Sequence, residues 1–170
     1  MFKTLFRRFK HTIYICLASD HVSALDVQNG LHVEEVAAIS LDAQNGTIIA
    51  VGNSASASMS DDSHVGRIVR PFAHPRTIID HFTEAECFIR YLVYELLEPK
   101  LIKSNPVMIL HPIEKLEGGL TEIEVRALRE MALGAGAVDV YIWTGPELSA
   151  EQINAKDWPA LGQWHGDEPA

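Results

Sequence analysis

The hydrophobic pattern of residues 122–133 predicts an amphipathic helix. Apolar side chains at positions 127, 128, 131 and 132 fall on one helical face. Thr121 and Glu124 have the spacing of a capping box at the start of this helix, and Gly134 is expected to end it in the left-handed conformation. The sequence therefore has signals for the start, the apolar face and the end of this helix.

Two segments beside this helix predict strands of a partly parallel sheet. Residues 107–110 form a short, continuous apolar run, which is typical of a strand buried on both faces. Residues 138–143 follow the helix and have the alternating pattern of a second strand. A strand, a helix and a strand in this order favour a right-handed crossover.

The N-terminal part of the chain predicts three strands, over residues 12–17, 22–27 and 31–40. Asn29-Gly30 lies between the second and third of them and is a strong signal for a hairpin, so we expect antiparallel pairing. A capping box at Thr83 and a wide apolar stripe behind it predict a further helix. This order of elements indicates an α/β domain.

Composition and charge exclude several classes of protein. The formal net charge of -9 argues against a general nucleic-acid binder, because phosphate contacts need clustered basic residues. No stretch is long and apolar enough to span a bilayer. Cys16 and Cys87 lie in apolar segments with no secretory signal ahead of them, so we expect buried thiols in the cytoplasm. The eight histidines show no paired ligand spacing, and no metal site is expected.

Residues 1–11 have a chemistry of their own and predict a basic amphipathic helix. Its apolar stripe recurs at helical spacing and consists of Phe2, Leu5, Phe6 and Phe9. Its cations are Lys3, Arg7, Arg8 and Lys10. Phenylalanines facing acyl chains and cations facing anionic headgroups describe an interfacial membrane anchor. The alternative is a helix that packs on its own domain.

Several motifs resemble those of MreB, the bacterial actin-like family that determines rod shape. An apolar strand is followed by His111-Pro112, residues 121–137 read T-x-x-E-x-R-A-x-R-E-x-A-x-G-A-G-A, and Gly145-Pro146 follows the next strand. The resemblance covers about residues 1–150. By the family's plan this is the first of two related domains, so the chain corresponds to about half of a full member.

The resemblance implies an actin-like, ribonuclease-H-like fold: a mixed sheet of three antiparallel and then parallel strands with flanking helices and a small inserted lobe. It places a single domain over residues 12–154 and the lobe over residues 43–80. Residues 155–170 lack periodicity and are expected to form a flexible tail. Trp158 and Trp164 are its candidate docking residues.

The family's phosphate loop would fall on residues 16–22, where this chain departs from the family pattern. Cys16 stands at the position of a metal-organising aspartate, and Ala18 at the position of a glycine that lets backbone amides reach phosphate. Ser19 keeps a hydroxyl, while Asp20, followed by His21, adds negative charge. ATP and magnesium are cofactors in the family, and we expect that this degenerate loop has lost them.

Glu124 has two interpretations. By resemblance it falls on the glutamate that positions the attacking water for ATP hydrolysis in MreB. By local sequence it is a member of the Thr121 capping box, which satisfies backbone amides without catalysis. The degenerate phosphate loop favours the cap, and we expect no enzyme activity.

These observations predict a non-catalytic scaffold of cell-shape or envelope assembly, cytoplasmic and peripheral to the inner membrane. Its expected partners are an anionic membrane surface and full-length MreB or other cell-shape proteins. Two alternatives stay open: an ATP-binding half that another chain completes, and a homodimer with a structural role.

Overall fold

The computed structural model describes residues 11–57, 65–97 and 105–169. The predicted N-terminal helix lies outside these residues, apart from His11. No helix in the described ranges is long and apolar enough to cross a membrane.

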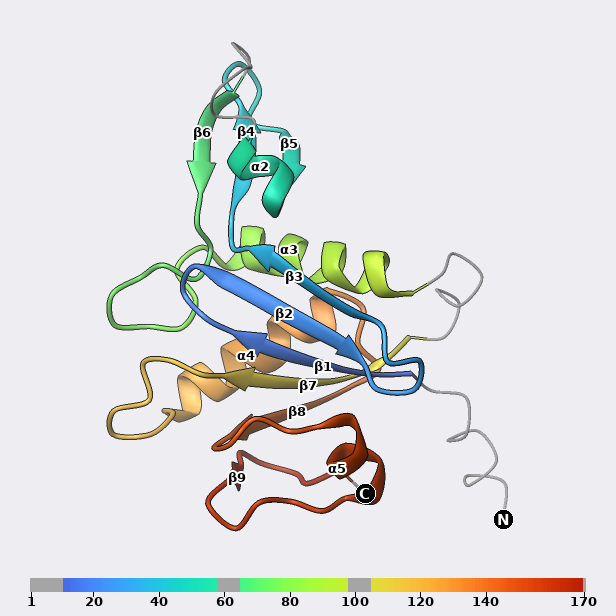
Figure 1. The fold of residues 1–170 in the computed structure, drawn as a ribbon. Helices are drawn as coiled ribbons and strands as arrows, with labels where there is room; N and C mark the ends of the chain where they lie inside the picture. The colour runs from blue at the N-terminus through green and yellow to red at the C-terminus, as the bar shows by residue number, and fades with distance from the viewer. Residues whose placement is uncertain (1–10, 58–64, 98–104, 170) are drawn as a thin grey trace.

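The larger of two sheets has six strands in the order β3-β2-β1-β7-β8-β9 (Figure 1). The first three pair antiparallel, β7 is parallel to both β1 and β8, and β9 is antiparallel to β8. This confirms the predicted mixed sheet and adds a strand, β9, that the sequence did not indicate. The strands are β1 (Thr12–Leu17), β2 (His21–Asp26), β3 (His32–Val36), β7 (Val107–Pro112), β8 (Asp139–Thr144) and β9 (Gln163–Trp164).

The two faces of the larger sheet pack on different elements. Helices α3 (Phe82–Leu96) and α4 (Glu122–Gly134) cover one face and form the larger core with Ile13, Ile15 and Leu17 of β1. The alternate residues Tyr14 and Cys16 lie in a smaller core on the opposite face, where α5 (Ala150–Ala155) packs. Because neighbouring side chains of a strand point to opposite faces, β1 contributes to both cores.

One end of each long helix differs from the prediction. Helix α3 begins after His81, and no side chain caps it, so the capping box predicted at Thr83 is wrong. The capping box of Thr121 and Glu124 is confirmed. Gly134 is the last residue of α4, and Gly136, with a φ of 108°, takes the left-handed conformation in its place.

The small lobe consists of a three-stranded sheet in the order β5-β4-β6 with a short helix. Its elements are β4 (Ile39–Asp42), β5 (Ile48–Val51), α2 (Asn53–Ala57) and β6 (Val65–Val69). The sheet begins at Ile39, whereas we expected the lobe over residues 43–80. The strand predicted over 31–40 is divided after Val36. The N–H of Ala37 still donates to the carbonyl oxygen of Asp20 at 2.8 Å, in the register of β2 and β3, whereas the N–H of Ala38 turns back to the carbonyl oxygen of Val36 at 2.7 Å. The chain then continues into the second sheet.

Glu35 ties the lobe to the edge of the larger sheet. Its Oε2 accepts a hydrogen bond from the backbone N–H of Asn53 at 2.6 Å, and Asn53 Oδ1 accepts one from the N–H of Val36. Gly52 packs so closely on the Glu35 side chain that a β-carbon there would lie 2.2 Å from a carboxylate oxygen. The lobe is therefore held at its base by direct contacts.

The C-terminal residues correct the prediction of a flexible tail. Trp164 of β9 pairs with Trp143 of β8, and the two indole rings lie 4.8 Å apart. Trp158 packs edge-on against Trp164 at 4.9 Å, and its Nε1 donates to Glu168 at 2.6 Å. Burial of aromatic surface against the sheet accounts for this order. The two tryptophans predicted as docking residues thus belong to the packing of the domain.

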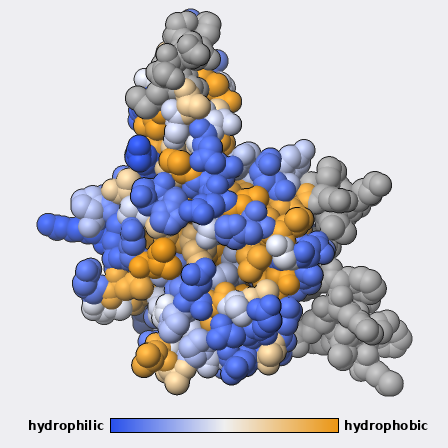
Figure 2. Space-filling model, viewed as in Figure 1, coloured by the Kyte–Doolittle hydropathy of each residue, from blue (hydrophilic) through white to orange (hydrophobic). Residues whose placement is uncertain are grey.

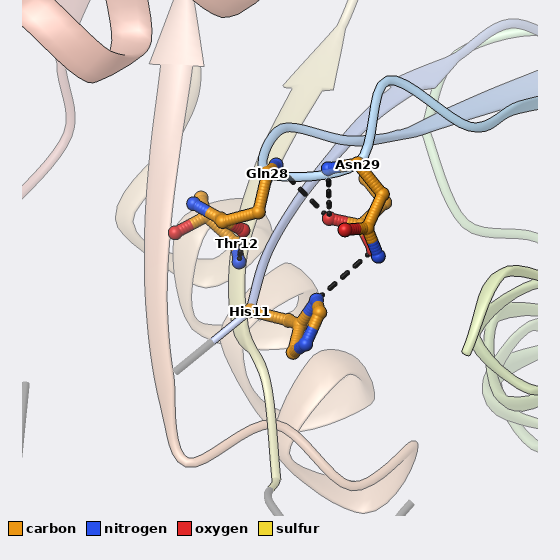
Figure 3. A network of polar contacts seen from close by, with 5 residues as sticks. His11, Thr12, Gln28 and Asn29 are labelled. Carbon is orange, nitrogen blue, oxygen red and sulfur yellow. Dashed lines mark hydrogen bonds and ion pairs between the residues drawn. The ribbon is translucent and has the colours of Figure 1, made fainter. Parts of the chain in front are cut away.

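Asp26 is a fully buried carboxylate that organises the start of β1 and the turn after β2. Its Oδ1 accepts hydrogen bonds from the backbone of Gln28 and Asn29, and its Oδ2 lies 3.0 Å from Nδ1 of His11. Gln28 in turn accepts the N–H of Thr12 through Oε1 at 2.6 Å (Figure 3). These bonds fix the point at which the N-terminal segment joins the sheet.

The same turn occurs a second time in the lobe. Residues 25–30 read LDVQNG and residues 41–46 read LDAQNG. In both turns the aspartate side chain accepts two backbone N–H groups, and the glycine has a φ near 70°. Asp42 therefore shares the turn geometry of Asp26, whose carboxylate also lies 3.0 Å from Nδ1 of His11.

We expect that Asp26→Ala lowers the free energy of unfolding by about 1.5–3 kcal/mol, because it removes hydrogen bonds to a buried charged acceptor. Asp42→Ala is the matched control, since it removes the equivalent two turn bonds and leaves the contact of Asp26 with His11 in place. Urea titrations monitored by circular dichroism measure both. Equal losses in the two variants would show that the further contacts of Asp26, with His11 and with Nδ2 of Asn29, contribute nothing.

Candidate functional site

The turn between β1 and β2 meets the loop after β7 at one end of the larger sheet. Leu17 pairs with Pro112 across the parallel strands, so the two segments leave the sheet side by side. Ser19 donates both its backbone N–H and its hydroxyl to Oε2 of Glu114, at 2.9 and 2.5 Å. These bonds hold the pKa of Glu114 below its ordinary value. A carboxylate of the chain itself thus occupies two donors that the turn would otherwise offer to an anion.

Lys115 follows Glu114 in the sequence, and its ammonium group is bonded to backbone carbonyl groups. Its Nζ donates to the carbonyl oxygens of Phe72 and Thr77, at 2.6 and 3.2 Å. Partial burial lowers the pKa of Lys115. The hollow left between Ala18, Phe72 and Lys115 has a volume of about 10 Å³, which is room for about one water molecule.

Asp20 and His21 lie at the exposed side of the same turn. Asp20 Oδ1 is 2.6 Å from Nδ1 of His21, and this hydrogen bond lowers the pKa of Asp20. The turn is closed by a hydrogen bond from the N–H of Ala18 to the carbonyl oxygen of His21 at 3.1 Å. Ser19 is therefore flanked by the carboxylates of Asp20 and Glu114, which repel further negative charge.

Cys16, at the position of the family's aspartate, lies in the smaller core. Its Sγ is 3.8 Å from Nδ1 of His111, and burial raises the pKa of the thiol. A thiol held in its protonated form is a poor ligand for a hard cation. Cys16 thus shares the sheet end with Ser19 but packs against other residues.

A buried polar network passes behind Cys16. The hydroxyl of Tyr14 accepts the N–H of Leu148 at 3.0 Å and lies 2.5 Å from Nδ1 of His111. Nε2 of His111 is 3.0 Å from the carbonyl oxygen of Gly145, which only accepts, so Nε2 carries the proton. Burial lowers the pKa of His111 and raises that of Tyr14, which keeps both neutral. The network binds β1 and β7 to the segment that leads into α5.

Glu124 lies at the N-terminus of α4. Its Oε2 accepts the backbone N–H of Thr121 at 3.0 Å and the hydroxyl of Thr121 at 2.8 Å, and its own N–H donates to Thr121 Oγ1 at 3.2 Å. The carboxylate therefore satisfies the helix end, as the local sequence predicted. Its assignment to catalysis rests on the resemblance alone.

The profile of the MreB/Mbl protein family matches residues 10–154. The chain belongs to the MreB/Mbl family. Two structures of MreB5 from Spiroplasma citri, one bound to AMPPNP and one to ADP, share the actin-like fold with TM-scores of 0.62 and 0.61. This confirms the fold class that the resemblance implied.

The likeness to these two MreB5 structures is partial. Each is 22% identical to the chain and matches 78% of it, while the chain spans 38% and 37% of their lengths. No curated protein matches this MreB-family chain. The bound nucleotides, AMPPNP and ADP, are properties of the two Spiroplasma structures.

Glu114 is the site residue that sequence reasoning missed. Its contact with Ser19 was not predicted. The contact could have been predicted from the parallel pairing of the two strands that end at Leu17 and Pro112. Ser19 and Glu114 each stand two residues beyond such a strand end, which brings them to the same edge of the sheet.

We expect the free energy of unfolding to fall as the pH drops below about 6.5, the unperturbed pKa of histidine. The folded state lowers the pKa of His111, so below that pH the unfolded chain binds a proton that the folded chain excludes. Urea titrations between pH 5 and 8 measure the loss, about 1.4 kcal/mol for each unit of pKa depression.

His111→Gln is expected to flatten this profile, with a remaining slope from His165, whose pKa burial also lowers. His32→Gln, at an exposed position of β3, is the control and should keep the slope of the unaltered chain. A profile for His111→Gln as steep as that of the control would contradict the assignment.

Proposed function

We propose that this MreB-family chain is a non-catalytic scaffold or modulator of cell-shape or envelope assembly at the inner face of a bacterial membrane. The contact between Ser19 and Glu114 is the observation that carries the proposal. Both donors of Ser19 are already bonded to a carboxylate, at the turn where the family resemblance places phosphate. A protein that does not turn over nucleotide acts through its surfaces.

Three neighbours of this contact support the same interpretation. Cys16 offers a buried thiol where a hard cation needs oxygen, and the methyl group of Ala18 fills space beside the turn. Asp20 adds a second carboxylate to that of Glu114. Each of these features opposes a magnesium triphosphate by a separate physical effect, so restoring one of them would leave the others in place.

Membrane attachment is the second part of the proposal. The apolar stripe and the cations of residues 2–10 have the composition of an interfacial anchor. His11 follows this segment and is held to Asp26 at 3.0 Å. An anchor joined to a fixed point of the sheet would orient the whole domain on the bilayer.

The lobe offers a surface for a protein partner. Figure 2 shows apolar colour as small islands between hydrophilic side chains, including on the lobe. Ile48 and Ile49 of β5, which is an edge strand of the lobe sheet, are 45% and 38% exposed. Exposed apolar edges are typical of interaction sites. We propose that this edge contacts filaments of full-length MreB.

Isothermal titration of the full chain with magnesium ATP is expected to give no binding in the micromolar range, and thermal unfolding should be unchanged by the nucleotide. Glu114→Ala frees the donors of Ser19, while Glu117→Ala changes an exposed acid of the same loop and serves as the control. Micromolar uptake by the unaltered chain would replace the scaffold with the ATP-binding alternative.

Addition of the chain to polymerising full-length MreB is expected to change the amount of polymer that sediments. Ile48→Lys should reduce this effect severalfold, because it charges the lobe edge. Leu161→Lys is the matched control, since Leu161 is 89% exposed outside the lobe. Unchanged sedimentation with the unaltered chain would count against the scaffold, and equal effects of the two variants against the lobe edge.

A further inference from the structure

A hollow of about 370 Å³ opens at the other end of the larger sheet from Ser19. Its floor is the face of β7 and β8 that carries the smaller core, with Ile109 and Tyr141. Ile153 and Trp158 of the C-terminal segment form a wall. The volume lies within the range of pockets that bind small ligands or side chains, about 300–1,000 Å³.

The N-terminal segment joins the sheet at the rim of this hollow. Thr12 and Gln28 both line it, and the N–H of Thr12 donates to Gln28 at 2.6 Å (Figure 3). His11 is held on both sides, by Asp26 and by the N–H of Val107, which donates to its carbonyl oxygen at 2.8 Å. Lys10 is therefore attached two residues from a lining residue of the hollow.

The composition of residues 1–10 complements the hollow and its surroundings. Phe2, Leu5, Phe6 and Phe9 provide an apolar stripe that in a helix is about 10 Å long, so it stays close to its attachment point. The segment has four basic residues and no acidic one. Residues 147–169, which include one wall of the hollow, have five acidic residues and a single lysine.

We propose that the apolar stripe of residues 2–9 docks in this hollow and leaves it for an anionic bilayer. The occupant is part of the same chain, so its effective concentration at the rim is high. The same phenylalanines would serve both sites, and each site then excludes the other. The exchange rests on the membrane attachment proposed above, whereas docking in the absence of a membrane does not.

Photo-crosslinking of the full chain tests the docking. We expect benzoylphenylalanine at position 6 to crosslink, on irradiation, to peptides that contain Ile109 or residues 153–158, as mapped by mass spectrometry. The same probe at Thr4, which lies off the stripe, is the control and should give severalfold fewer of these products. Crosslinks to other regions, or between two chains only, would overturn the docking.

A second measurement uses tryptophan fluorescence. Phe6→Ser together with Phe9→Ser should increase quenching by acrylamide, because an emptied hollow exposes Trp158. In a Trp158→Phe background the increase should disappear. Equal quenching with and without the two serines would overturn the docking even if all variants fold.

Co-sedimentation and crosslinking in the presence of phosphatidylglycerol vesicles distinguish docking in the hollow from attachment to the membrane. We expect the chain to co-sediment with them and the crosslinks from position 6 to fall severalfold. Co-sedimentation without any crosslink to the hollow in solution would overturn the docking and leave the anchor. Crosslinks without co-sedimentation would overturn the anchor and the exchange, and leave the docking.

Discussion

The parallel pairing of β1 with β7 is the constraint on which the rest of the structure depends. Because Thr12 lies opposite Val107 and Leu17 opposite Pro112, one register decides which residues meet at both ends of the sheet. At one end it brings Ser19 to Glu114, and at the other it forms the floor and rim of the hollow. Between them it aligns Cys16 with His111. A slip by one residue would exchange the two cores and separate the polar partners.

The second face of the sheet is completed by the segment that was expected to be a tail. Trp143, Trp158 and Trp164 pack on one another over that face, and the network of Tyr14 and His111 ties the same segment to β1 and β7. Without this cover the alternate residues of β1 would face water. The segment that protects the smaller core is thus also the one that shapes the hollow.

Most of the elements that are encoded locally were predicted from the sequence, although the capping box at Thr83 was not found. The Thr121 capping box, the hairpin at Asn29-Gly30 and the strands around α4 each follow from the spacing of neighbouring residues, and the structure has them. The division of residues 31–40 between two sheets was missed because it depends on long-range partners: β3 pairs with β2, while Ile39 and Ser40 pair with β5 and β6. The contact of Glu114 with Ser19 and the order of the C-terminal tryptophans were missed for the same reason, since both arise from long-range pairing.

The passage from β3 to β4 has a mechanical consequence. Ala37 belongs to the two-residue connection that leads from one sheet into the other, and its N–H is bonded to the backbone of Asp20, the neighbour of Ser19. A load applied to the lobe would therefore reach the turn of Ser19 through this peptide group, and the edge of the larger sheet through Glu35 and Asn53. Deformation of the lobe would thus be felt at the bond between Ser19 and Glu114.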